Sequence, residues 1–223
     1  MTISDEGTTV ALRGIRRAAA RQMTAAWAAP AFHLNVEVDM THALTVKSVF
    51  PASTVTDLLI GVCAQALSEH PGINAHYSEN GITTFEDINI GLAVATDAGL
   101  TVPNLHRLAT LTITEIAVLR REAVERARAR RLTMADVAGG TFTISNLGML
   151  GIDRFDAILN APQVAILAVG STRPRYVLRG DAGEWQPIAD LTLTCDHRAV
   201  DGAAGAAFLA RIKELLESPV RAS

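Results

Sequence analysis

The residues whose types and spacing best suit catalysis lie near the C-terminus, in the stretch 196–202, Asp-His-Arg-Ala-Val-Asp-Gly. His197 stands four residues before Asp201 and five before Gly202, which gives the pattern His-x-x-x-Asp-Gly. An imidazole is partly neutral near pH 7 and can act as a general base toward a thiol or a hydroxyl. Asp201 is less specific, because an aspartate can simply cap the helix that follows. Gly202 can allow close backbone approach at the turn.

A second stretch, 139–148, supplies a different chemical function and reads Gly-Gly-Thr-Phe-Thr-Ile-Ser-Asn-Leu-Gly. Attack on a thioester carbonyl builds an oxyanion, and one positioned donor contributes about 10²–10³-fold to the rate. Ser145, or Asn146 beside it, ends an expected strand and enters a glycine-containing loop, where a short polar side chain can point into a channel. The alternative is a plain turn, because serine, asparagine and glycine all favour turns.

Together the two stretches resemble the catalytic domain of dihydrolipoamide acyltransferases, the acyl-transferring components of the 2-oxo acid dehydrogenase complexes. The resemblance implies that His197 is the general base and that Ser145 donates a hydrogen bond to the oxyanion. It implies that Asp201 organises the site through an ion pair with an arginine, which the sequence does not identify.

The resemblance also implies a co-substrate, acyl-CoA, with acetyl-CoA as the expected case. Phe155 matches an aromatic residue at the CoA entrance, although an aromatic side chain there would by itself more often belong to a core. We group Asn146, Phe155 and Gly202 as the candidate CoA-binding residues. No lipoyl group is expected on this chain, because no lipoyl domain precedes the catalytic unit in the sequence.

The resemblance covers about residues 12–219 and implies an α+β (mixed α/β) fold like chloramphenicol acetyltransferase, with a mixed sheet flanked by helices. We expect a flexible tail over 1–9 and one acyltransferase domain over 10–223. The implied assembly is a homotrimer with the active site at the subunit interface, where the histidine of one protomer faces the serine of its neighbour. The C-terminal end lacks an apolar tail, which suggests that assembly stops at the trimer.

The elements that must position these residues follow from periodicity and capping patterns. Asn80-Gly81 favours a tight hairpin near 79–81, and a Thr-x-x-Glu capping box begins at Thr112. Thr56 is the expected cap of the helix that contains Cys63. Helices are expected over 12–27, 57–67, 112–131 and 204–216, and strands over 32–40, 141–144, 164–169, 175–178 and 185–194, with two short strands within 88–102.

Composition excludes several other classes. Apolar residues make up 49% of the 223-residue chain, charged residues 19%, and the net charge is −3, a soluble globular composition that argues against nucleic acid as a partner. The longest apolar run, near 164–169, is far short of a membrane span. Cys63 and Cys195 are too few and too scattered for a metal site or a disulfide framework, and Cys195 is expected to be a small apolar strand residue. Without a signal-peptide pattern, we expect a cytoplasmic protein.

Three functions remain open. The preferred one is a standalone enzyme that moves an acyl group from acyl-CoA to a small-molecule hydroxyl or thiol, such as a tetronate-type natural-product intermediate. It is preferred because the lipoyl domain is missing and the segment 41–51 is shorter than the helix that relatives place there. The second is a dihydrolipoamide acyltransferase that works with a separate lipoyl carrier. The third is a non-catalytic trimeric scaffold, against which the intact His197, Asp201 and Ser145 argue.

Overall fold

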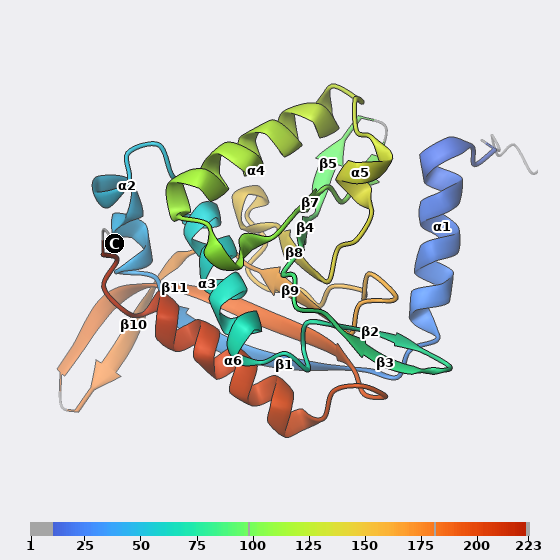
Figure 1. Ribbon diagram of the computed structural model, residues 1–223. Helices are drawn as coiled ribbons and strands as arrows, with labels where there is room; N and C mark the ends of the chain where they lie inside the picture. The colour runs from blue at the N-terminus through green and yellow to red at the C-terminus, as the bar shows by residue number, and fades with distance from the viewer. Residues whose placement is uncertain (1–10, 98, 181, 222–223) are drawn as a thin grey trace, which may run out of the picture.

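A seven-stranded mixed sheet organises the chain, and the computed structural model describes residues 11–97, 99–180 and 182–221 (Figure 1). The helices are α1 (Gly14–Trp27), α2 (Val46–Val49), α3 (Val55–Glu69), α4 (Ile113–Arg128), α5 (Met134–Val137) and α6 (Gly202–Leu216), with short 3-10 turns η1 (Ala43–Thr45), η2 (Leu108–Thr110) and η3 (Gly148–Leu150). The strands are β1 (Ala31–Asp39), β2 (Ala75–Ser78), β3 (Gly81–Thr84), β4 (Ile90–Leu92), β5 (Val94–Thr96), β6 (Gly99–Thr101), β7 (Asn104–Leu105), β8 (Phe142–Asn146), β9 (Ala165–Val169), β10 (Arg173–Arg179) and β11 (Ala182–Asp196).

Strand direction in the sheet decides where its ends place functional residues. The order is β1-β11-β9-β8-β4-β7, and β10 also pairs with β11. Strands β4, β8 and β9 run parallel to one another, whereas β11 runs antiparallel to both β9 and β1. The first part of β11 pairs only with β10, and this hairpin extends away from the sheet in Figure 1. Along the strand direction, the C-terminal end of β11 therefore lies at the opposite end of the sheet from the C-terminal ends of β8 and β9.

The two faces of the sheet differ in what covers them, because successive strand residues point to opposite faces. On β11, Leu191, Leu193 and Cys195 belong to the main apolar core beneath the helices. Alternate positions, Thr192 and Thr194, point to the other face. That second face is covered in part by a small separate cluster of Ala157, Leu159, Ile166 and Ala168.

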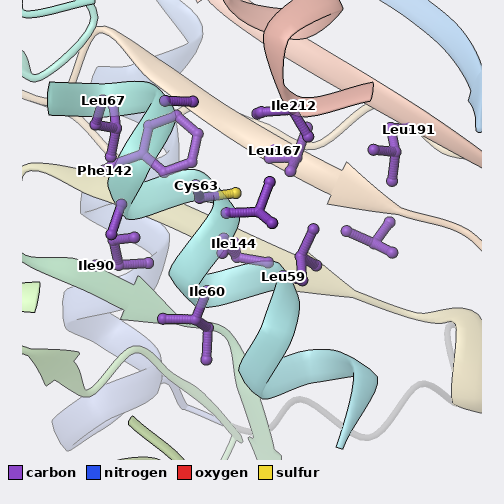
Figure 2. Close-up of a cluster of buried hydrophobic side chains, with 14 of the residues drawn as sticks. Leu59, Ile60, Cys63, Leu67, Ile90, Phe142, Ile144, Leu167, Leu191 and Ile212 are labelled. Carbon is purple, nitrogen blue, oxygen red and sulfur yellow. The ribbon is translucent and has the colours of Figure 1, made fainter. Parts of the chain in front are cut away.

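Helices α3 and α6 close the main core over the sheet. Figure 2 shows Leu59, Ile60, Cys63 and Leu67 of α3 clustered with Phe142 and Ile144 of β8, and with Leu167, Leu191 and Ile212. An ion pair joins α3 to α4. Asp57 is fully buried, and its carboxylate accepts a hydrogen bond from Arg120 Nε at 2.5 Å.

Most expected elements are present, with one correction. Strand β1, the β2–β3 hairpin and the Thr112 capping box are confirmed. Thr56 is not the cap of α3: the helix begins at Val55, and Thr54 forms the capping box with Asp57. The segment 41–51, expected to be shorter than the helix of relatives, holds the short elements η1 and α2.

The expected tail over 1–9 lies outside the described residues. Among the helices that the structure does describe, none combines the length and the apolar character needed to cross a membrane.

Candidate active site

His197 is the first residue after β11, in the turn that leads to α6. Its backbone N–H donates to the Pro30 carbonyl at 3.0 Å, which ties the turn to the start of β1. Its imidazole lies against the Phe32 ring, with ring centroids 4.7 Å apart and an interplanar angle of 49°. The side chain is exposed and forms no hydrogen bond within the described part of the chain. The imidazole of His197 is thus held by Phe32 on one side and exposed on the other.

The residues on either side of His197 fix its turn. Asp196 is almost fully buried, and its carboxylate accepts hydrogen bonds from Arg198 Nε at 2.9 Å and from Arg198 Nη2 at 2.6 Å. Arg198 also stacks over the Tyr77 ring of β2, with Cζ 3.9 Å from the ring centroid. The hydrogen bond to Asp196 raises the pKa of the Arg198 guanidinium, so this cation persists at any working pH. The sequence analysis did not predict this ion pair between Asp196 and Arg198, although the two residues stand on either side of the histidine in the sequence.

Asp201 caps α6, as the sequence analysis allowed. It is the N-cap residue, and its Oδ1 accepts a hydrogen bond from the Ala204 N–H at 2.8 Å. The implied ion pair between Asp201 and an arginine does not form among the described residues, because the nearby Arg198 pairs with Asp196 instead. Gly202 has open space around it: an added Cβ would meet no atom within 4 Å. Close backbone approach at Gly202 is therefore not required by the fold of a single chain.

Ser145 lies near the C-terminal end of β8 and is half-buried. It pairs with Ala168 of β9, and Ala168 pairs with Thr192 of β11. Because Ile144 points into the main core, Ser145 points to the opposite face of the sheet, away from α3 and α6. Its hydroxyl forms no hydrogen bond to any described residue. The hydroxyl is therefore available to a ligand or to another chain.

Ser145 and His197 of one chain do not meet. Ser145 lies level with Thr192, whereas His197 comes five residues later, just past the end of β11. At about 3.3 Å per residue and about 4.8 Å per strand, the two are separated by about 16 Å along the sheet and about 10 Å across it. A base and an oxyanion donor that serve one carbonyl must both lie within hydrogen-bond reach of the reacting groups. One chain therefore carries two half-sites at opposite ends of its sheet.

The remaining candidates surround the Ser145 half-site. Asn146 points to the main-core side, and its Oδ1 accepts from the Gly148 N–H at 2.9 Å, which closes the turn after β8. It lines a cavity of about 160 Å³ beneath the start of α3. Phe155 is half-buried and packs on the small cluster that includes Ala168, so it lies on the same face of the sheet as Ser145. Two residues before Ser145, Thr143 Oγ1 donates to Gln163 Oε1 at 2.6 Å.

Cys195 takes no part in this chemistry. It is buried on β11, and burial together with the charge of Asp196 raises the pKa of its thiol to about 12. A thiol with so high a pKa holds almost no thiolate near neutrality and is a poor nucleophile. Within the described residues, no group of three or more His, Cys, Asp or Glu is placed to hold a metal ion.

Comparison with known proteins decides the family. The family model for "2-oxoacid dehydrogenases acyltransferase (catalytic domain)" matches residues 4–223. The chain belongs to this family. A relative from Rickettsia bellii, named the dihydrolipoyllysine-residue acetyltransferase component of pyruvate dehydrogenase complex, is 37% identical over 199 residues, which is 85% of this chain and 48% of the relative. The similarly named mitochondrial protein of Dictyostelium discoideum is 34% identical and aligns with 99% of this chain and 36% of its own. This chain thus spans about half or less of the length of these curated relatives.

Solved structures of family members have the same fold. A probable dihydrolipoamide acetyltransferase from Listeria monocytogenes superposes with a TM-score of 0.90 at 31% identity, covering 95% of both chains. The Azotobacter vinelandii dihydrolipoamide acetyltransferase gives a TM-score of 0.90 at 30% identity over 95% of this chain and 92% of that one. A chloramphenicol acetyltransferase, at 12% identity and a TM-score of 0.56, shares the fold. The expected mixed sheet flanked by helices is confirmed.

Proposed function

We propose that this domain transfers an acyl group, with acetyl as the natural case, between dihydrolipoamide and CoA. The names of the relatives support this acceptor better than the small hydroxyl acceptor that the sequence analysis preferred. In particular, they give no support to a role in natural-product biosynthesis. The second of the three functions derived from the sequence therefore replaces the first.

One observation carries the assignment of the site. The Azotobacter vinelandii enzyme was studied for the role of a serine, a histidine and an asparagine in its catalytic mechanism, and these three residues are spaced as Ser145, His197 and Asp201 are in this chain. An asparagine at the third position can make the same helix cap as Asp201, since asparagine and aspartate are about equally good N-caps. The shared feature at position 201 is then the cap rather than a negative charge.

The mechanism follows from the two half-sites. The imidazole of His197 takes the proton from the attacking thiol of CoA, and the sulfur attacks the carbonyl carbon of the acetyl thioester. The electron pair of the C=O bond moves to oxygen, where the Ser145 hydroxyl donates a hydrogen bond to the oxyanion. Collapse of this intermediate re-forms the carbonyl and breaks the bond to the dihydrolipoamide sulfur. That sulfur takes the proton back from the imidazolium, so no proton is gained or lost.

The separation of the half-sites supports a shared site. His197 of one protomer can face Ser145 of a neighbour if the two ends of the sheet meet across a heterologous interface. Three such interfaces close a C3 ring with three identical sites. The exposed His197 side chain and the unpaired Ser145 hydroxyl are both consistent with groups that find their partners across that interface.

Acceptor choice is the test. The purified domain should transfer acetyl from acetyl-CoA to free dihydrolipoamide, and His197→Ala should abolish the transfer while circular dichroism shows a native fold. Acetylation of a panel of primary alcohols without transfer to dihydrolipoamide would restore the hydroxyl-acceptor hypothesis. Transfer to neither acceptor, by a folded and assembled protein, would favour the scaffold hypothesis.

A further inference from the structure

The position of the His197 imidazole depends on the turn that carries it. The imidazole forms no hydrogen bond within the described part of the chain, and the Phe32 ring supports it on one side. A general base must lie within about 3 Å of the proton that it takes, and a displacement of about 1 Å can cost about 10²-fold in rate. The residues that hold this turn in place therefore matter to the rate.

The inner part of the turn is held by hydrogen bonds to Asp196. The Asp196 N–H donates to the Val164 carbonyl at 2.9 Å, which ties the turn to the segment before β9. The N–H groups of Ala199 and Val200 each donate to the Asp196 carbonyl at 3.0 Å. The Asp196 carboxylate also accepts from the Arg198 N–H at 3.1 Å. The backbone around His197 is thus folded over a buried carboxylate.

The outer part of the turn is held by the Arg198 guanidinium. In its plane, this group binds the Asp196 carboxylate through Nε and Nη2. On its face, it meets the ring of Tyr77, with Cζ 3.9 Å from the ring centroid. A planar guanidinium can make both kinds of contact at once, which a lysine ammonium cannot. Figure 1 shows the β2–β3 hairpin, which carries Tyr77, beside the turn between β11 and α6.

Tyr77 is itself firmly anchored. Its N–H donates to the Pro162 carbonyl at 2.8 Å, and the Val164 N–H donates to the Ala75 carbonyl of the same strand at 3.1 Å. Its ring is half-buried and packs against the main apolar core. Since Val164 also accepts a hydrogen bond from the first residue of the turn, β2 and the turn share one support. The Tyr77 ring is therefore a fixed surface on which the guanidinium rests.

We propose that Tyr77 is a positioning residue: its ring acts through Arg198 to hold the turn so that the His197 imidazole stays within reach of the attacking thiol. The inference rests on the proposed function in taking His197 as the base. A guanidinium stacked on an aromatic ring at a partly exposed site is a weak contact. We therefore expect its loss to affect the placement of the base far more than the stability of the fold.

Removal of the ring tests this role. Tyr77→Leu keeps an apolar side chain against the core and should lower kcat about 10-fold, with little change in the KM for acetyl-CoA, because only the placement of the base changes. Tyr77→Phe should keep kcat within about twofold of the parent value, since the ring and not the hydroxyl meets the cation. The matched control is Tyr176→Leu, the same change at an exposed tyrosine of β10, which should keep the parent kcat.

A double-mutant cycle shows whether Tyr77 acts through Arg198. Arg198→Gln removes the cation but leaves an amide that can still donate to Asp196, and it should lower kcat at least as much as Tyr77→Leu. If the ring acts through the guanidinium, Tyr77→Leu/Arg198→Gln should be no slower than Arg198→Gln alone. Additive losses would give Tyr77 a separate role and overturn the proposal.

A spectroscopic measurement reports the placement of His197 without any substrate. The Phe32 ring lies against the imidazole, so its ring current shifts the His197 Cε1–H resonance by an amount that depends on their geometry. In protein labelled with ¹³C at histidine Cε1, His197→Ala assigns this resonance by its loss. The resonance should move and broaden in Tyr77→Leu and stay in place in Tyr77→Phe.

Three further results would overturn the proposal: parent kcat and an unmoved resonance in folded Tyr77→Leu, an equal loss in Tyr77→Phe, or a loss confined to KM. Circular dichroism checks the fold of each variant. If Tyr77→Leu does not fold, Arg198→Gln carries the same test, and a parent kcat in that variant would refute the role of the guanidinium. Failure of transfer to dihydrolipoamide would refute the proposed function and leave the resonance measurement standing, so the two failures are distinguishable.

Discussion

Mixing two inactive variants should restore activity, because each variant lacks a different half of the site. His197→Ala removes the base and should lower kcat by about 10²–10⁴-fold. Ser145→Ala removes the oxyanion donor and should lower kcat by about 10²–10³-fold. In the proposed ring, each site takes its histidine from one chain and its serine from the next, so a mixed ring contains some sites in which both are intact.

The size of the recovery follows from the geometry. After random reassembly of equal amounts, a site is intact when its histidine comes from a Ser145→Ala chain and its serine from a His197→Ala chain. Each condition holds with probability of about one half, so about one quarter of all sites should be active in a C3 ring. The expected kcat per chain is therefore about one quarter of the parent value, against about one hundredth or less for either variant alone.

The assay needs verified subunit exchange. The variants are mixed at concentrations low enough to dissociate the ring, reconcentrated, and checked for mixed trimers by native mass spectrometry with one variant isotopically labelled. A matched control mixes His197→Ala with the double variant His197→Ala/Ser145→Ala, which has no intact histidine and should recover nothing. Absence of recovery in the test mixture despite confirmed mixed trimers would refute the shared site, as would full activity in a parent monomer.

The other expectations concern single residues. Ser145→Ala should lower kcat with little change in the KM for acetyl-CoA, and a loss confined to KM would make Ser145 a binding residue instead. Asp201→Asn should keep both activity and stability, whereas Asp201→Ala should lose about 1 kcal/mol of unfolding free energy in urea titrations, as expected for a lost N-cap. Arg120→Leu should cost about 3–5 kcal/mol in the same titrations, since it leaves the buried Asp57 carboxylate without its cation. Burial raises the pKa of the Cys195 thiol to about 12, so this thiol should resist alkylation at pH 8. Its raised pKa contributes stability that is present below pH 9 and is lost as the pH rises toward 12, which unfolding at graded alkaline pH would check.

Local patterns in the sequence predicted the local structure well. The alternation after Phe32 predicted strand β1, and the Thr112 capping box predicted the start of α4, because both signals depend only on near neighbours. The prediction that Thr56 caps α3 was wrong, and the reason is also local. Thr54 and Thr56 both precede Asp57, but only Thr54 has the three-residue offset that lets the side chain and the backbone exchange hydrogen bonds.

The arrangement of the site depends on contacts that no local pattern contains. That Ser145 and His197 stand at opposite ends of the sheet follows from the strand order β11-β9-β8, which pairs segments distant in the sequence. The contact between Arg198 and Tyr77 likewise requires the β2–β3 hairpin to lie beside the turn after β11. The resemblance implied that Asp201 pairs with an arginine. Arg198 instead pairs with Asp196, whose buried carboxylate is closer along the chain and has less access to water.

The opposite placement of the two half-sites has a genetic consequence. In a ring where every site is built from two chains, a folded chain that lacks both His197 and Ser145 spoils each of the two sites to which it contributes. A ring with one such chain and two normal ones keeps only about one third of its sites, although about two thirds of its chains are intact. An allele that loses both residues but still folds and assembles would therefore be dominant-negative when expressed beside the normal gene, whereas an allele whose product cannot assemble would be recessive.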